Sequence, residues 1–245
     1  MLNDPNLYWR ITASPEGRKL WAGIWGDDVA DLWNGVDYNF TDEEKRLGFI
    51  PWHAVCEAHE RSAIVTNNPC FGLDMALNFQ EDFANTGPLV HLFKNVKTTR
   101  QMLILAIRYQ KLHTNGFTLS FKEDLEKNEV IGTTIFHPMS GPHRQFLEHL
   151  SGVVFTMARH FVKDFQAKHI TFQHRAPDDL TPYEKVFGDT PIIFNAARNM
   201  IVADLKYLNL DRKSIIMSAL HKSANLYLRQ KRKNHPFAKN PWQAR

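Results

Sequence analysis

Four polar residues have the types and positions needed to orient a small molecule. Arg108, Tyr109 and His113 lie close together in the chain, and His174 lies in a later run of alternating apolar and polar residues. An arginine guanidinium binds a carboxylate through two parallel hydrogen bonds, so Arg108 suits a ligand with an acidic group. The sequence therefore predicts a binding site whose polar contacts come from these four side chains.

Aromatic residues supply the apolar wall that such a site needs, because ligand pockets are mostly apolar with a few placed polar groups. The candidates lie on the apolar faces of a predicted hairpin and of two later predicted strands: Phe117, Phe121, Phe136, Phe172 and Phe194. The alternative interpretation is a filled core whose edge is capped by the polar residues. Period-two patterns alone do not distinguish a lined cavity from a filled core.

A basic segment at the end of the chain is the second candidate for binding. Nine lysines and arginines and no acidic residue follow Asp211, although the formal net charge of the whole chain is only +4. The densest cluster is Arg229, Lys231, Arg232 and Lys233. Such a segment favours weak, salt-sensitive contact with nucleic acid, or else it is a solvated terminus. Two prolines, Pro236 and Pro241, prevent a continuous recognition helix, so we expect no sequence-specific binding of DNA by this chain alone.

No arrangement of residues supports catalysis or a metal centre. The chain has no G-x-S-x-G, no H-E-x-x-H and no glycine-rich phosphate loop, and no two of its twelve histidines are spaced i, i+4. Cys56 and Cys70 form no C-x-x-C pair, which favours two reduced thiols in a cytoplasmic protein. We therefore expect no enzymatic activity, no metal and no other cofactor. The absence of a signal peptide or a long apolar run also favours the cytoplasm.

Periodicity predicts the elements that position these residues. Helical spacing of apolar residues predicts helices over 15–33, 51–65, 73–79, 98–112 and 143–165. Alternation predicts a hairpin of residues 117–121 and 130–136. After residue 169 we expect a strand through His174, a turn, a short helix opened by Thr181 and Pro182 and ended by Gly188, and strands at 191–194 and 200–203.

This order of elements predicts an α+β fold, with N-terminal helices and an antiparallel sheet on which the long amphipathic helix packs. The apolar stripe of that helix predicts core packing or a dimer seam. We expect an N-terminal helical extension at 1–48, an effector-binding and dimerisation domain at 49–211 and a basic linker helix and tail at 212–245. The topology resembles the haem–nitric-oxide-binding domains, but their Y-x-S-x-R signature is missing, so no haem is expected.

The order of short motifs over residues 49–210 resembles one known family. The residues that carry the resemblance near the end are Phe172, His174, Pro177, Asp179, Tyr183, Phe187, Gly188, Pro191, Ile192, Phe194 and Asn199. Earlier matches are Gly72-Leu73, Thr99-Arg100 and Arg108-Tyr109. In these positions the chain resembles the N-terminal effector-binding and dimerisation domain of AraC-type transcriptional regulators. It departs from the pattern at Asp189, where a cysteine is frequent.

The resemblance implies a bacterial ligand-sensing domain that binds a small-molecule effector, forms a homodimer and acts by a conformational shift. It also implies that specific DNA contact belongs to a C-terminal helix-turn-helix module, which this sequence lacks. The alternative function is a nucleic-acid-binding protein that acts through the basic C-terminal tail. No membrane partner is expected.

Overall fold

The structure, a computed structural model, describes residues 7–10, 49–78, 96–112, 114–138, 143–162 and 164–210. The predicted helix at 15–33, His113 and the basic segment after residue 211 lie outside these described residues. The described part combines helices with a mostly antiparallel five-stranded sheet, which confirms the α+β prediction.

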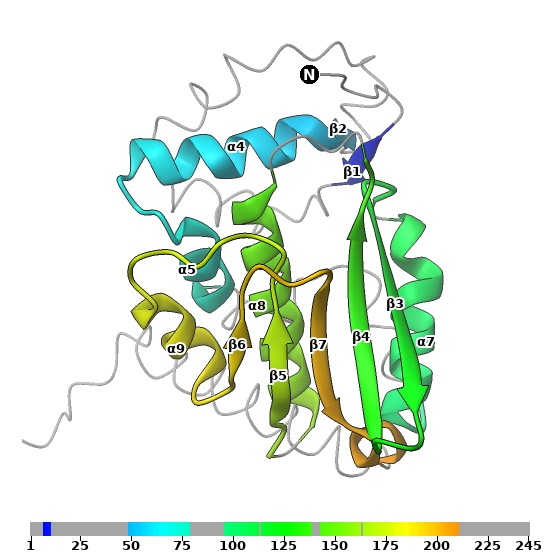
Figure 1. The fold of residues 1–245 in the computed structure, drawn as a ribbon. Coiled ribbons are helices and arrows are strands. Elements are labelled where there is room, and N and C mark those ends of the chain that lie inside the picture. The colour runs from blue at the N-terminus through cyan, green and yellow to red at the C-terminus, as the bar shows by residue number, and fades with distance from the viewer. Residues whose placement is uncertain are drawn as a thin grey trace, which may run out of the picture.

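The central sheet has the strand order β3-β4-β7-β5-β6 (Figure 1). Its strands are β3 (Phe117–Asp124), β4 (Glu129–Phe136), β5 (Ala167–Thr171), β6 (Ile192–Ile193) and β7 (Asn199–Asp204). All neighbours pair antiparallel except β5 and β6, which are parallel. A parallel pair needs a crossover connection, and the helix α9 (Thr181–Phe187) lies in that connection.

The predicted hairpin is confirmed as β3 and β4, with Phe117 opposite Phe136 and Asp124 opposite Glu129. Its turn needs a residue with positive φ, and Asn128 supplies it at 53°. The Asp124 carboxylate also accepts a hydrogen bond from the Lys127 backbone N–H at 3.0 Å. A polar turn between two alternating segments therefore produced the expected register.

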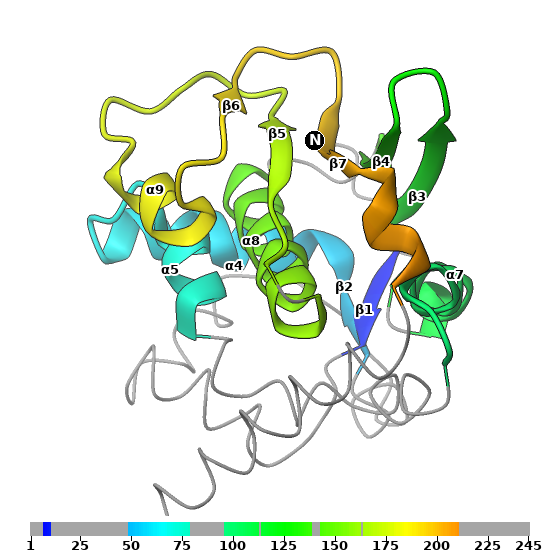
Figure 2. The same cartoon turned by 90° about the horizontal axis from the view of Figure 1, so that it is seen from below.

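The remaining helices are α4 (Trp52–Val65), α5 (Phe71–Asn78), α7 (Thr99–Tyr109) and α8 (Arg144–Phe161). In the view from below, α4, α5 and α8 lie on one side of the sheet (Figure 2). Helix α8 runs behind β5 and buries Phe146, Leu147 and Phe155. The apolar stripe predicted for this helix is used by the core only in part, because Val153 and Val154 are half-buried and belong to neither buried cluster.

Helices α5 and α8 approach closely because small residues lie between them. A Cβ atom on Gly72 would lie 2.0 Å from the backbone oxygen of Gln145, and one on Gly152 would lie 2.5 Å from the Cβ of Ala76. Gly72 belongs to α5 and Gly152 to α8, so each helix contributes a position where a larger side chain does not fit. This contact places α5 directly on the first half of α8.

Two clusters of buried residues form the core. The larger one joins α8 to the sheet, α5 and α9, through residues such as Phe155, Phe172 and Phe187. The smaller one surrounds Trp52 and includes Leu7, which precedes β1 (Tyr8–Arg10). Strand β1 pairs with β2 (Phe49–Pro51), so the few described residues near the N-terminus pack on the same body.

Several boundaries differ from the sequence predictions; for example, the long helix ends at Phe161 rather than at residue 165. Strand β5 ends at Thr171, before His174, because the chain then turns toward α9. Helix α9 is opened by Asp179, whose carboxylate accepts from the Thr181 N–H at 2.9 Å, rather than by the Thr181 side chain. The helix that begins after the cap Thr98 narrows into the 3-10 turn η4 (Gln110–Leu112) instead of continuing as an α-helix.

Candidate functional site

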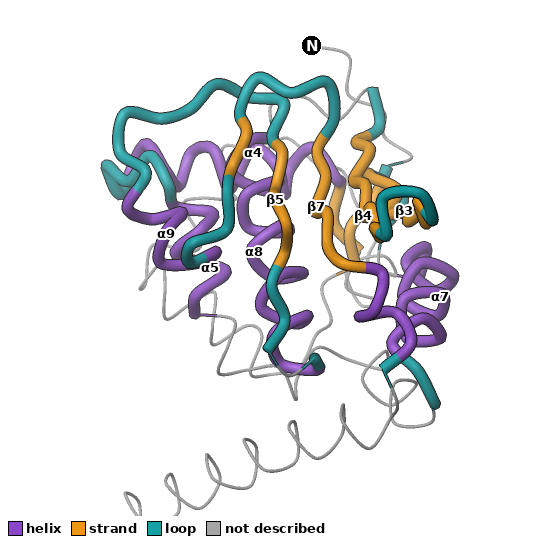
Figure 3. Tube along the Cα trace, turned by 60° about the horizontal axis from the view of Figure 1, so that its bottom comes forward, coloured by secondary structure: helices purple, strands orange, loops and turns teal. Residues whose placement is uncertain are grey.

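A pocket of about 360 Å³ lies between helix α7 and strand β3. Its lining consists of Ile104, Ile107, Arg108, Ser120 and Phe121. Helix α7 stands apart from the other described helices, beside the β3–β4 end of the sheet (Figure 3). The pocket is therefore an open cleft beside the edge strand, accessible to solvent along most of its length, rather than an enclosed cavity.

An ion pair holds the first turn of α7 against the sheet. Both guanidinium nitrogens of Arg100 bond the Glu123 carboxylate of β3, and one of them also donates to the Asn209 side chain at 3.3 Å. Asn209 belongs to the 3-10 turn η5 (Leu205–Asn209), which follows β7. The bidentate geometry gives this contact directional specificity as well as charge attraction.

A glutamine holds the other end of α7. The Gln110 side chain is buried, donates to the Phe117 carbonyl and accepts from the Leu119 N–H at 2.8 Å. It therefore pairs with the backbone of β3 as a neighbouring strand would, and it satisfies polar groups of an edge strand. With both ends of α7 fixed, the middle of the helix forms a stable wall of the pocket.

The chemistry of the pocket is apolar with one cation. Ile104 is 47% exposed, so part of its apolar surface is accessible to a ligand. Arg108 is exposed and has no ion pair within the described ranges. A ligand with an apolar body and an acidic group would match this arrangement, because it covers the isoleucine and pairs with the guanidinium.

A second group of polar residues is buried where α8, α9 and the segment after β5 meet. Glu148 of α8 is fully buried, and its Oε1 accepts from Arg144 Nε at 2.7 Å and from the Tyr183 hydroxyl at 2.5 Å. Burial, partly offset by Arg144 and Tyr183, raises the pKa of Glu148. We call Arg144, Glu148, Tyr183 and His174 the α8 polar cluster.

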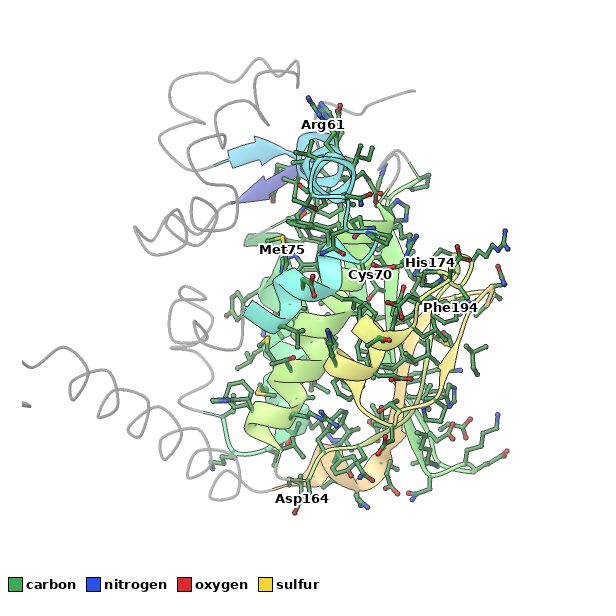
Figure 4. All side chains as sticks on the ribbon, turned by 90° about the vertical axis from the view of Figure 1, so that its left-hand side faces the viewer. Arg61, Cys70, Met75, Asp164, His174 and Phe194 are labelled. Carbon is green, nitrogen blue, oxygen red and sulfur yellow. The ribbon has the colours of Figure 1, made fainter. Side chains whose placement is uncertain are left out.

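His174 completes this cluster from the segment that follows β5. Its Nε2 lies 3.6 Å from Glu148 Oε1, and its Nδ1 lies 2.9 Å from the Arg175 carbonyl. The ring also packs against Phe172 and Phe194, with centroid distances of 5.0 and 5.6 Å. Figure 4 shows His174 beside Phe194. Burial lowers the pKa of His174.

Gln145 ties the start of α8 to the neighbouring helices. Its side chain accepts from the Gly72 N–H at 2.8 Å and donates to the Pro69 carbonyl at 2.8 Å. Its own N–H donates to the Glu60 carboxylate of α4, also at 2.8 Å, so an acidic side chain satisfies a free N–H at the start of this helix.

Two histidines form a neighbouring pair between α4 and α8. His59 Nδ1 lies 2.8 Å from the Val55 carbonyl, and His59 Nε2 lies 3.1 Å from His149 Nδ1. A carbonyl only accepts, so His59 Nδ1 carries the proton and His149 Nδ1 donates to His59 Nε2. Burial lowers the pKa of His59 to about 4 and that of His149 to about 3.

The structure divides the residues predicted for one site into three places. Arg108 and Phe121 line the α7–β3 pocket. Phe117 and Phe136 pack around Trp52. Phe172, His174 and Phe194 lie beside the α8 polar cluster. Tyr109 is half-buried near the end of α7 and does not line the pocket.

Several residues of these sites were missed by sequence reasoning. Ile104 and Ile107 belong to the apolar pattern of α7, which predicts burial rather than a pocket wall. Arg144 and Glu148 had a usable signal, because oppositely charged residues spaced i, i+4 on a helix form a pair. Their spacing predicts the pair but not the burial of Glu148, because both residues lie outside the apolar stripe predicted for α8.

The described residues offer little for other kinds of site. No three of their His, Cys, Asp or Glu side chains are grouped closely enough to hold a metal ion. Within the same residues, no helix has the length and apolar character needed to cross a membrane. Both cysteines, Cys56 and Cys70, are buried and free.

Comparison with known proteins gives a family and a fold. Residues 26–211 match the family described as the arabinose-binding domain of AraC transcription regulator, N-terminal. The crystal structure of the transcriptional regulator CdpR from Pseudomonas aeruginosa is similar to this chain, with a TM-score of 0.55 and 12% identity. That similarity covers 91% of this chain and 67% of the CdpR chain. The sequence matches no curated protein.

Proposed function

Because the chain belongs to the family of arabinose-binding N-terminal domains of AraC transcription regulators, we propose that it senses a small-molecule effector through the pocket between α7 and β3. The observation that carries this proposal is the exposed Arg108 beside an apolar cleft of about 360 Å³. An effector that binds one conformation of the domain more tightly shifts the population toward that conformation. The role is regulatory and cytoplasmic, without catalysis.

The lining of the pocket favours an apolar acid over a sugar as the effector. A sugar presents many hydroxyl groups and needs several polar partners, whereas Arg108 and Ser120 are the polar residues of this lining. A carboxylate with an aliphatic or aromatic body needs one cation and an apolar wall. Phe121 and Ile107 supply that wall. His113 remains a predicted contact, whereas Tyr109 does not line this pocket.

Thermal unfolding with matched ligands tests the pocket. Aliphatic and aromatic carboxylic acids are compared with the amides of the same acids, since a ligand that binds only the folded state raises its apparent stability. We expect stabilisation by some acids and not by their amides, and loss of this effect in Arg108→Gln. Lys185→Gln removes an exposed cation of α9, at the opposite end of the sheet from the pocket, and serves as the control. Equal stabilisation of Arg108→Gln and the unchanged chain by the same acid would show that the pocket is not the effector site.

We also propose that the domain forms a homodimer, as the family resemblance implies. Helix α8 contributes less to a dimer surface than its sequence suggests, because the sheet, α4 and α5 already pack on it. Light scattering of the full chain is the test. A strict monomer at high protein concentration would contradict the proposal.

DNA contact through the basic tail is the second candidate function, and the acid-free segment after Asp211 supports it. The tail residues proposed for it are Arg229, Lys231, Arg232 and Lys233. Charge alone gives weak binding that falls steeply with salt. A full chain in which these four residues are glutamine should lose DNA affinity without losing effector binding. Strong preference for one DNA sequence near physiological salt would require a different explanation.

A further inference from the structure

Two buried polar atoms of the α8 polar cluster have no hydrogen-bond partner within the described part of the chain. They are Oε2 of Glu148 and Nε2 of His174. Glu148 is fully buried, and the side chain of His174 is 15% exposed. An unsatisfied buried polar atom costs about 1–3 kcal/mol, so a pair of them at one place needs an explanation.

The hydrogen bonds around the pair determine where protons already lie. His174 Nδ1 faces the Arg175 carbonyl at 2.9 Å, and because a carbonyl only accepts, Nδ1 must carry the proton. In a neutral imidazole the other nitrogen, Nε2, then has only a lone pair. That lone pair faces the carboxylate of Glu148, whose nearer oxygen is 3.6 Å away and already accepts from Arg144 and Tyr183. Acceptor therefore faces acceptor.

One proton removes this conflict. A proton on Nε2 forms an imidazolium that can donate to the carboxylate, and a proton on the carboxyl group forms an acid that can donate to Nε2. Because the nearest carboxylate oxygen is 3.6 Å away, either bond requires the His174 ring to move slightly toward α8. Both atoms are shielded from solvent in the observed packing. We propose that Glu148 and His174 together form a proton-binding site, and that the proton fastens residues 172–180 to helix α8.

Some of the charged and titratable groups around the pair favour its protonation, and others oppose it. Arg144 favours the ionised carboxylate and, with His143, disfavours a charged His174, whereas Glu60 of α4 favours protonation of Glu148. Tyr183 of α9 donates to the carboxylate. The thiol of Cys70 is neutral, because burial raises its pKa to about 11. Glu148 and His174 are thus coupled, and the titration belongs to the pair rather than to either residue.

The fastened segment connects the sheet to α9. It follows β5, carries His174, and ends at the Asp179 side chain that opens the helix. The His174 carbonyl also accepts from the Asn195 N–H at 3.0 Å, which links the segment to the loop after β6. A bond between His174 and α8 would therefore reduce the motion of the whole connection. This device does not depend on the proposed effector pocket, which lies on the β3 side of the sheet.

The first test uses the unmodified full chain. Heteronuclear NMR of the histidine rings reports which ring nitrogen carries a proton. At neutral pH we expect His174 as the Nδ1–H tautomer, with one protonation event of the pair as the pH falls. Observation of the Nε2–H tautomer at neutral pH would overturn the proposal without any substitution.

The second test follows amide hydrogen exchange of residues 172–180 against pH, corrected for intrinsic exchange. Protection should rise as the pH falls through the titration of the pair, by at most about tenfold per pH unit, because one proton is taken up. In Glu148→Gln the amide donates to Nε2 at every pH, so protection should be high and independent of pH. In His174→Phe it should be low and independent of pH.

Glu123→Gln is the matched control, because it neutralises an exposed carboxylate that is also paired with an arginine. It should retain the pH dependence of the unmodified chain. Protection that is flat with pH in the unmodified chain, or still pH-dependent in His174→Phe, would overturn the proposal.

Discussion

The α7–β3 pocket and the α8 polar cluster both place an arginine on a helix beside apolar side chains, but they use it differently. Arg144 is paired with a fully buried carboxylate and lies near a tyrosine and a histidine. Arg108 is exposed beside Ile104 and Phe121. The first arrangement joins neighbouring helices, whereas in the second the guanidinium has no ion pair with any residue that the structure describes, as the proposed effector site requires.

The difference teaches that burial and pairing, rather than residue type, decide whether a charged side chain stabilises the fold or can contact a ligand. A buried charge without its partner is strongly unfavourable, so the neighbours of Glu148 are required for the fold. An exposed guanidinium keeps its hydration and needs no partner in the free protein. Substitutions in the cluster should therefore change stability, and those in the pocket should change binding.

The largest effect is expected for Glu148→Ala. Loss of the carboxylate leaves the Tyr183 hydroxyl and part of Arg144 without a partner inside the core, which should lower the free energy of unfolding by about 3 kcal/mol. Urea denaturation measures the change. Glu123→Ala, which breaks the exposed pair beside the pocket, should have a clearly smaller effect. Similar losses for both variants would contradict the distinction between the two regions.

The next effect is expected where α5 meets α8, next to the cluster. Gly72→Ala would place a Cβ atom 2.0 Å from the Gln145 backbone oxygen, so the helices must separate. We expect a loss of about 2 kcal/mol in unfolding free energy, as is typical of overpacking. Gly132→Ala on β4 is the control, because its Cβ would meet Ile201 O at an ordinary 3.6 Å. Equal stabilities for the two variants would show that this close approach is unimportant.

A third effect is the acid sensitivity of the His59–His149 pair. Both pKa values are lowered by burial, to about 4 and about 3, so the unfolded chain binds more protons below its histidine pKa of about 6.5. Stability should therefore be full above that pH and fall as the pH drops toward 4, by up to about 1.4 kcal/mol per pH unit for each proton. Denaturation at a series of pH values measures the slope.

The variant His149→Gln shows whether this histidine pair causes the acid sensitivity. In His149→Gln the amide still donates to His59 Nε2, but one titrating group is gone. The acid dependence should become shallower while stability at neutral pH changes little. An unchanged slope would mean that other groups cause the acid sensitivity.

The smallest effect on stability is expected for Arg108→Gln in the pocket. An exposed side chain without an ion pair should contribute within about 0.5 kcal/mol to the free energy of unfolding. Its affinity for an acidic effector should fall by tenfold or more, which calorimetric titration measures. A large loss of stability would indicate that Arg108 is structural, like Arg144.

Several elements were predictable because local chemistry decides them. The hairpin follows from alternation and a polar turn, and α7 begins where the Thr98 side chain accepts from the Gln101 N–H. Gly188 ends α9 with a φ of 64°, which a glycine adopts without strain. These signals act within a few residues, so a single sequence is sufficient to find them.

The candidate sites were less predictable because their parts come from distant segments. Phe117 and Phe121 lie on the same face of β3, but Phe117 packs on Trp52 whereas Phe121 faces α7. Gln110 was not predicted as a partner of β3, since nothing local distinguishes it from a solvated glutamine. Which aromatic residue lines a pocket depends on the neighbour across the space between elements.

The sequence by itself determined the α+β class, most helices and strands, and the AraC-type family, because periodicity, caps and motif order are properties of the chain. Tertiary structure decided that Arg144 pairs with Glu148 while Arg108 is exposed and unpaired among the described residues, and that Glu148 meets Tyr183 and His174. The physical reason is that burial and pairing depend on the approach of separate elements. The electrostatic state of each group follows from that approach.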